Sequence, residues 1–174
     1  MWLNLVTDSL PALALGMEPV EKDIMKQKPR GSADRLFTKP FSLRLAWQGI
    51  MVAALTLSAY CLGEYVLGDP IAADATANTM AFATLTLSQL FHAFDVRSED
   101  QSLFRIGVFS NKSMNEAFLV GLAMQMSVLC LPPLQKIFSV VFLTPTEWLV
   151  VLLLAISPLL IGEAVKAIRH GVRK

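Results

Sequence analysis

Four apolar blocks, each long enough to cross a lipid bilayer, limit this chain to one class of fold. The blocks cover about residues 45–67, 75–94, 114–134 and 148–168, and a membrane-spanning helix needs about 20 apolar residues. Only 17% of the residues are charged, whereas a soluble domain carries about 25%. The sequence therefore predicts an all-α, polytopic transmembrane helix bundle with four complete spans and no soluble catalytic domain.

A fifth apolar piece covers about residues 1–16 and has no polar residues in front of it. It lacks the basic start and the small-residue cleavage site that are typical of a signal peptide. We therefore expect it to be the second half of a further span, so that the bundle gains an N-terminal half-span. No repeat or domain boundary interrupts residues 1–174, which we predict to form one membrane domain.

The basic residues lie mostly on one side of these predicted spans. Fourteen of the fifteen Lys and Arg residues fall in residues 17–44, in residues 95–112 and at the C-terminal end, and four spans place these segments together. Basic loops usually remain in the cytoplasm, so we expect a multi-pass membrane protein with cytoplasmic basic loops and C-terminus. Glu163 and Lys166 are expected to pair at the membrane interface. The net charge of +1 argues against a nucleic-acid partner.

The N-terminal half-span contains a cluster of polar residues. Asn4, Thr7 and Asp8 share one face of a helix by their spacing, and Pro11 leaves the backbone carbonyl of Thr7 without its helical donor. Carboxylate, amide, hydroxyl and carbonyl oxygens are the ligands that a hard cation such as Ca²⁺ prefers. The alternative is that Asp8 lies at the membrane interface and Pro11 starts a loop. Spacing alone leaves both interpretations open.

The second complete span carries a polar stripe at helical spacing, formed by Thr84, Ser88, Gln89, His92 and Asp95. Gln89 is a weaker candidate for a cation ligand or for a neighbour of the ion path. For Thr84 and Ser88 we favour hydrogen bonds between helices. His92 and Asp95 are expected at the membrane interface.

Three segments resemble P-type calcium pumps. Residues 2–16 (WLNLVTDSLPALALG) are similar to the sixth transmembrane helix of these pumps, and residues 21–26 (EKDIMK), with Pro29 and Arg30, resemble the loop that follows it. Residues 98–103 (SEDQSL) resemble the loop between helices eight and nine. The resemblance runs nearly end to end. It implies the C-terminal transmembrane domain of a Ca²⁺-transporting ATPase, truncated to half of helix six plus helices seven to ten.

The resemblance also implies roles for individual residues. Asn4 and Asp8 match ligands of the calcium site nearest the cytoplasm, and Thr7 matches a ligand of a second site. Gln89 stands where two-site pumps use a glutamate on helix eight. Since an amide supplies no charge, the resemblance favours one Ca²⁺ per cycle.

The catalytic motifs of the family (DKTG, TGE and GDGxND) do not occur in these residues. ATP with Mg²⁺ would therefore bind only in absent domains, and helices four and five would supply the remaining ligands. We expect this chain to be a truncated product or an excised domain that is not catalytic alone. Its expected partners are the lipid bilayer, Ca²⁺ and the remainder of the pump. The alternatives are a non-catalytic membrane scaffold or assembly subunit, or the same domain of a Mn²⁺ or Na⁺ pump.

Overall fold

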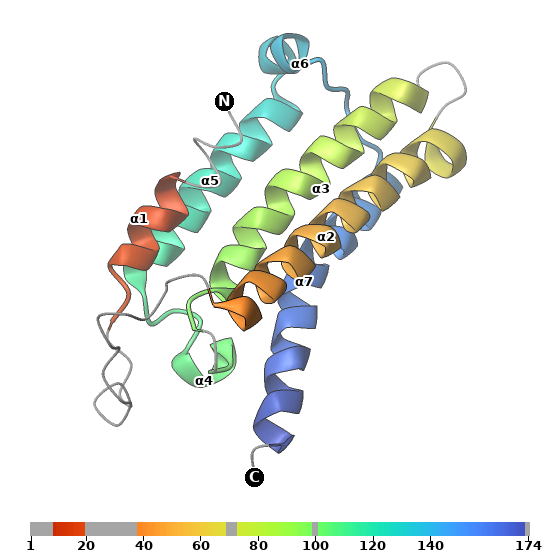
Figure 1. The fold of residues 1–174 in the computed structure, drawn as a ribbon. Helices are drawn as coiled ribbons and strands as arrows, with labels where there is room; N and C mark the ends of the chain where they lie inside the picture. The colour runs from red at the N-terminus through yellow and green to blue at the C-terminus, as the bar shows by residue number, and fades with distance from the viewer. Residues whose placement is uncertain (1–8, 20–37, 69–72, 99–100, 173–174) are drawn as a thin grey trace.

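The computed structural model describes residues 9–19, 38–68, 73–98 and 101–172. Every regular element in these ranges is helical, which confirms an all-α membrane helix bundle (Figure 1). In chain order the elements are α1 (Leu10–Gly16), α2 (Lys39–Leu62), the π-helical turn η3 (Gly63–Leu67), α3 (Ala73–Asp95), α4 (Leu103–Ile106), α5 (Lys112–Cys130), α6 (Pro132–Phe138) and α7 (Pro145–Val172).

Three helical stretches in the described part of the chain are long and apolar enough to cross a membrane. They are Phe41–Leu67, Lys112–Cys130 and Pro145–Ile168, and they coincide with three of the four predicted spans. The remaining predicted span coincides with α3, which has 23 residues but does not reach the same apolar composition. Its position explains the difference, because α3 buries more side chains than any other described helix and packs mainly against protein.

Helix α3 lies at the centre of the bundle. It packs against α7, α2, η3 and α5, and α1 lies on the far side of α5 from α2 (Figure 1). The main core gathers buried apolar residues from α2, α3, α5, α7 and the connection between α6 and α7: Ala59, Met80, Ala83, Leu87, Leu90, Val128, Leu129, Val140, Val151 and Ala155. The bundle is therefore organised around one polar, protein-covered helix.

The ends of the helices are set by local sequence. Thr144 and Glu147 form a reciprocal capping box at the start of α7, in which Thr144 N donates to Glu147 Oε2 at 2.7 Å and Glu147 N donates to Thr144 Oγ1 at 3.4 Å. Helix α5 begins where Asn111 Oδ1 accepts from Met114 N at 2.9 Å. It ends before the extended Leu131, which precedes Pro132.

A glycine allows α3 to approach the end of α2 closely. A Cβ added to Gly63 would lie 2.7 Å from the Cα of Ala77, a separation that real Cβ atoms do not tolerate. Gly63 therefore lets the two backbones come together directly, and it joins α2 and α3 into a tight hairpin.

Candidate functional site

The strongest predicted cation ligands lie outside the described residues. Asn4, Thr7 and Asp8 precede α1, which begins at Leu10 and has Pro11 in its first turn. The structure therefore describes the helix that directly follows these residues, and their role as ligands stays a prediction.

Helix α1 packs along the bundle through a second apolar cluster. Its Ala14 side chain is buried among Ala93 and Phe94 of α3 and Met114 and Ala117 of α5. These contacts come from two neighbouring helices and bury the side chain almost completely. This packing therefore fixes the helix that follows the predicted ligands.

The other predicted ligand, Gln89, is half-buried on α3 between the fully buried Ser88 and Leu90. The prediction for its neighbours Thr84 and Ser88 was wrong. Ser88 Oγ donates to Leu85 O within its own helix at 2.9 Å, and Thr84 Oγ1 has no partner among the described residues. Neither side chain forms the expected hydrogen bond between helices in this part of the chain.

A buried glutamine on α5, like Thr84 on α3, has polar side-chain atoms without a hydrogen-bond partner among the described residues. Gln125 is fully buried, and neither its Oε1 nor its Nε2 has a partner in the described part of the chain. Helices α3 and α5 run in opposite directions (Figure 1), and the rings of Phe91 and Phe118 are in contact with centroids 5.5 Å apart. Thr84 and Gln125 each lie two turns from these rings towards the same end of the bundle. The two unpaired polar groups therefore occupy one level, about 10 Å from the aromatic contact.

The segment that follows α1 is held by a buried ion pair that the sequence did not reveal. Arg97 Nη2 donates to Glu18 Oε1 at 2.7 Å, and Arg97 Nε donates to Glu18 Oε2 at 3.0 Å. The Arg97 side chain is fully buried, and that of Glu18 is 17% exposed. This two-pronged geometry is the strongest form of a carboxylate–guanidinium pair.

Further hydrogen bonds surround this pair. Arg97 also donates to the backbone carbonyls of Gly107 and Val108 at 3.2 Å and to Ser110 Oγ at 2.6 Å. Asn111 Nδ2 donates to Glu18 Oε2 at 2.7 Å and to the carbonyl of Ala14 at 3.1 Å. We call Glu18, Arg97 and Asn111 the anchor. It joins the end of α1, the end of α3 and the start of α5.

The anchor changes the acidity of Glu18. Burial alone would raise the pKa of this carboxyl, but hydrogen bonds from Arg97 and Asn111, together with the Arg97 charge, lower the pKa below its usual 4.5. Glu18 is therefore ionised at neutral pH and remains paired with Arg97.

A second ionic cluster connects the end of α3 to α7. Lys166 Nζ donates to the backbone carbonyl of Asp95 at 2.6 Å, lies 2.9 Å from Asp95 Oδ1, and donates to Glu163 Oε1 at 3.3 Å. Glu163 in turn accepts from the Ser102 hydroxyl and from Leu103 N at 3.0 Å. The pairing of Glu163 with Lys166 is confirmed. Asp95 ends α3 and is only 4% exposed, so it is covered by protein, and its expected place at the membrane interface stays a prediction.

Within the ranges that the structure describes, no three His, Cys, Asp or Glu side chains gather closely enough to hold a metal ion.

Comparison with known proteins decides the family. The family described as "Cation transporting ATPase, C-terminus" matches residues 1–168. The chain belongs to this family. This cation-ATPase chain is 42% identical to "Calcium-transporting ATPase 1" of Bacillus cereus over 95% of its length, and that match covers 20% of the relative.

Further relatives carry calcium-transporting names. The cation-ATPase chain is 38% identical to the "Calcium-transporting ATPase" of Bacillus subtilis over 91% of its length, covering 17% of that protein. It is 31% identical to the human "Calcium-transporting ATPase type 2C member 1" over its whole length, covering 18% of that protein. The chain thus spans about a fifth of the length of these relatives and corresponds to the C-terminal membrane region of a P-type cation pump.

No signal in the single sequence identifies the anchor. Glu18 directly follows α1, and Arg97 directly follows α3, but they are 79 positions apart. Charged residues at helix ends are common, so nothing in a single sequence pairs these two.

Proposed function

We propose that this cation-ATPase chain supplies the C-terminal membrane part of an ATP-driven Ca²⁺ pump. In this proposal Asn4 and Asp8 bind the transported ion, with Thr7 and Gln89 as weaker contributors. The chain does not hydrolyse ATP alone, because Mg-ATP binds to other domains of the complete pump. The basic loops and the C-terminus face the cytoplasm, and one Ca²⁺ moves in each cycle.

The anchor is the observation that best supports a cation site just before α1. A site in a pump needs ligands that are held in a defined position. Ala14 packs on α3 and α5, and Glu18 is fixed by Arg97 and Asn111. The helix next to Asp8 is therefore held at its far end by buried contacts.

The chemistry of the predicted ligands agrees with a hard cation. Asp8 offers a carboxylate and Asn4 an amide oxygen, and Ca²⁺ takes six to eight oxygen ligands in flexible geometry. The curated relatives are named as calcium transporters. Oxygen ligands do not separate Ca²⁺ from Mn²⁺, so the ion has to be tested directly.

The test is a chimera in which this chain replaces the matching C-terminal fifth of the Bacillus cereus pump. We expect Ca²⁺-dependent phosphorylation from ATP in the chimera and its loss in Asp8→Asn. The matched control is Glu116→Gln, since Glu116 is an exposed carboxylate; it should retain full phosphorylation. Mn²⁺ competition in the same assay measures ion preference.

Phosphorylation by inorganic phosphate without Ca²⁺ reports correct folding of each variant. If Asp8→Asn folds by this measure and still responds to Ca²⁺ like the unmodified chimera, the proposal is wrong. In that case a role as a membrane scaffold without transport fits better.

A further inference from the structure

The end of α1 is tied to the bundle through Glu18. Glu18 N donates to the carbonyl of Leu15 at 3.1 Å and so closes the last turn of α1. The Glu18 carboxylate accepts from Arg97 at 2.7 and 3.0 Å. Asn111, at the start of α5, donates to the same carboxylate and to the carbonyl of Ala14. The backbone of Glu18 thus belongs to α1, while its side chain is held by the ends of two other helices.

All five N–H groups of the buried Arg97 guanidinium are used. Nε and Nη2 donate to the two carboxylate oxygens of Glu18. Nη1 donates to the carbonyls of Gly107 and Val108, and Nη2 also donates to Ser110 Oγ. Because the side chain is fully buried, any rotation of the guanidinium would leave buried polar groups without a partner. The orientation of Arg97 is therefore fixed from several sides.

Arg97 also takes its position from the central helix of the bundle. It follows Asp95, the last residue of α3, by two positions, and Val96 N donates to the carbonyl of His92 at 3.2 Å, which extends the last turn of α3. Helix α3 buries more side chains than any other described helix. The pair of Arg97 and Glu18 therefore sets where α1 ends relative to the best-packed part of the protein.

The position of α1 bears on ion binding, because the predicted ligands Asn4 and Asp8 directly precede this helix in the sequence. A site binds its ion only while its ligands are in place, so the apparent dissociation constant rises as the fraction of correctly placed sites falls. We infer that Arg97 is a positioning residue that sets the affinity of the pump for its transported cation, acting through Glu18 and α1. The inference rests on the proposed function, in which Asn4 and Asp8 bind Ca²⁺.

The chimera with the Bacillus cereus pump provides the experiment. Phosphorylation from ATP is measured over a range of free Ca²⁺ concentrations, and phosphorylation from inorganic phosphate without Ca²⁺ counts the folded pumps. In Arg97→Gln we expect half-maximal phosphorylation at a Ca²⁺ concentration at least fivefold higher, with the same maximum per folded pump. A loss of stability alone would lower the number of folded pumps and would leave this concentration unchanged.

Two milder substitutions test the same pair. Arg97→Lys keeps the charge without the forked geometry, so its Ca²⁺ requirement should lie between those of the unmodified chimera and Arg97→Gln. Glu18→Gln removes the charge on the side of α1 and should raise the requirement at least threefold. Since both changes break one link, the double variant Glu18→Gln with Arg97→Gln should require no more Ca²⁺ than Arg97→Gln alone.

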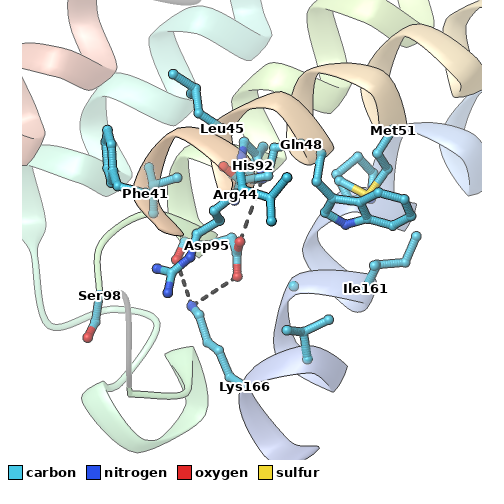
Figure 2. Close-up of a pocket in the computed structure, with 16 residues that line it drawn as sticks. Phe41, Arg44, Leu45, Gln48, Met51, His92, Asp95, Ser98, Ile161 and Lys166 are labelled. Carbon is cyan, nitrogen blue, oxygen red and sulfur yellow. Dashed lines mark hydrogen bonds and ion pairs between the residues drawn. The ribbon is translucent and has the colours of Figure 1, made fainter. Parts of the chain in front are cut away.

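Two controls break contacts that do not involve α1. Lys166 of α7 is another nearly buried cation, and its Nζ lies 2.9 Å from Oδ1 of Asp95 at the end of α3 (Figure 2). Lys166→Gln therefore also leaves a buried carboxylate without its cation. Ser110→Ala removes the hydroxyl that accepts from Arg97 Nη2 but keeps both bonds of Arg97 to Glu18. Both controls should keep the Ca²⁺ requirement within twofold of the unmodified chimera.

The results separate this inference from the proposed function. An unmodified chimera without Ca²⁺-dependent phosphorylation contradicts both. If the unmodified chimera responds to Ca²⁺ and Asp8→Asn does not, an unchanged Ca²⁺ requirement in Arg97→Gln and Glu18→Gln overturns this inference alone. An equal shift in Lys166→Gln also overturns it, because any loosening of the bundle would then have the same effect. If Arg97→Gln does not fold, Arg97→Lys and Glu18→Gln decide the question.

Discussion

Arg97 donates hydrogen bonds to both carboxylate oxygens of Glu18, from Nη2 at 2.7 Å and from Nε at 3.0 Å. The two residues are 79 positions apart in the sequence. The guanidinium also reaches the backbone carbonyls of Gly107 and Val108. One side chain therefore connects the end of α1, the end of α3 and the segment before α5. The stability of this junction should depend on it strongly.

Replacing Arg97 with Gln should lower the free energy of unfolding by about 3 kcal/mol, because it leaves a largely buried carboxylate without its cation. Arg97→Lys should recover part of the loss, since a lysine keeps the charge but not the forked geometry. Unfolding in mixed micelles with increasing dodecyl sulfate measures the change. Lys112→Gln breaks an exposed pair at 3.7 Å and should change nothing measurable. A loss for Lys112→Gln equal to that for Arg97→Gln would contradict the special role of the anchor.

The anchor should also make stability depend on acid. The pKa of Glu18 is lower in the folded chain than its usual 4.5, so the unfolded chain takes up a proton first as the pH falls. The stabilisation by Glu18 is therefore complete above about pH 5.5 and is lost as the pH falls through the folded pKa. Unfolding measured at several pH values should show that the difference between the unmodified chain and Glu18→Gln shrinks below about pH 4.5. A difference that stays constant with pH would contradict this prediction.

Gly162 should not tolerate a methyl group. A Cβ at this position would overlap the carboxylate of Asp95, which Lys166 holds in place. Gly162→Ala should therefore push α3 and α7 apart and lower the unfolding free energy by about 2 kcal/mol. Gly49→Ala is the matched control, because nothing lies within 4 Å of its added Cβ. It should stabilise α2 by about 0.5 kcal/mol, and equal effects of the two substitutions would contradict the prediction.

Two buried glutamines should respond in opposite ways to replacement by leucine. Gln125 has no partner for either side-chain atom in the described part of the chain, so Gln125→Leu should raise the unfolding free energy by about 1 kcal/mol. Gln135 donates to the carbonyl of Leu129 at 2.6 Å, so Gln135→Leu should lower it by a similar amount. The same micelle titration compares the two. A loss of stability in Gln125→Leu would show that its amide has a partner.

The sequence predicted the helices well where hydropathy decides them. The block at 148–168 lies inside α7, and that at 114–134 overlaps α5 until Leu131 takes an extended conformation before Pro132. Helix α2 begins at Lys39, earlier than its apolar block, because a proline in the first turn favours helix even where the residues are polar. Hydropathy identifies the apolar interior of a span, but it does not identify a polar first turn such as the one at the start of α2.

Side-chain partners were predicted less well, because they depend on contacts between distant segments. Asp95 lies at the end of α3, and nothing in the sequence indicates that Gly162 lets α7 come close enough to cover its carboxylate. Thr84 resembles a residue that bonds to a neighbouring helix, yet its hydroxyl has no partner among the described residues. The predicted ligands Asn4, Thr7 and Asp8 lie outside the described residues, and for them the sequence is the only guide.

The protein-covered position of α3 has a consequence for biosynthesis. A segment with this many hydroxyl and amide groups leaves the translocon less readily than the apolar helix before it. The contact of Gly63 with Ala77 offers a solution, since the nascent α3 can enter the lipid as one hairpin with α2. We therefore expect α2 and α3 to enter the membrane together, and we expect this joint insertion to depend on the glycine at position 63.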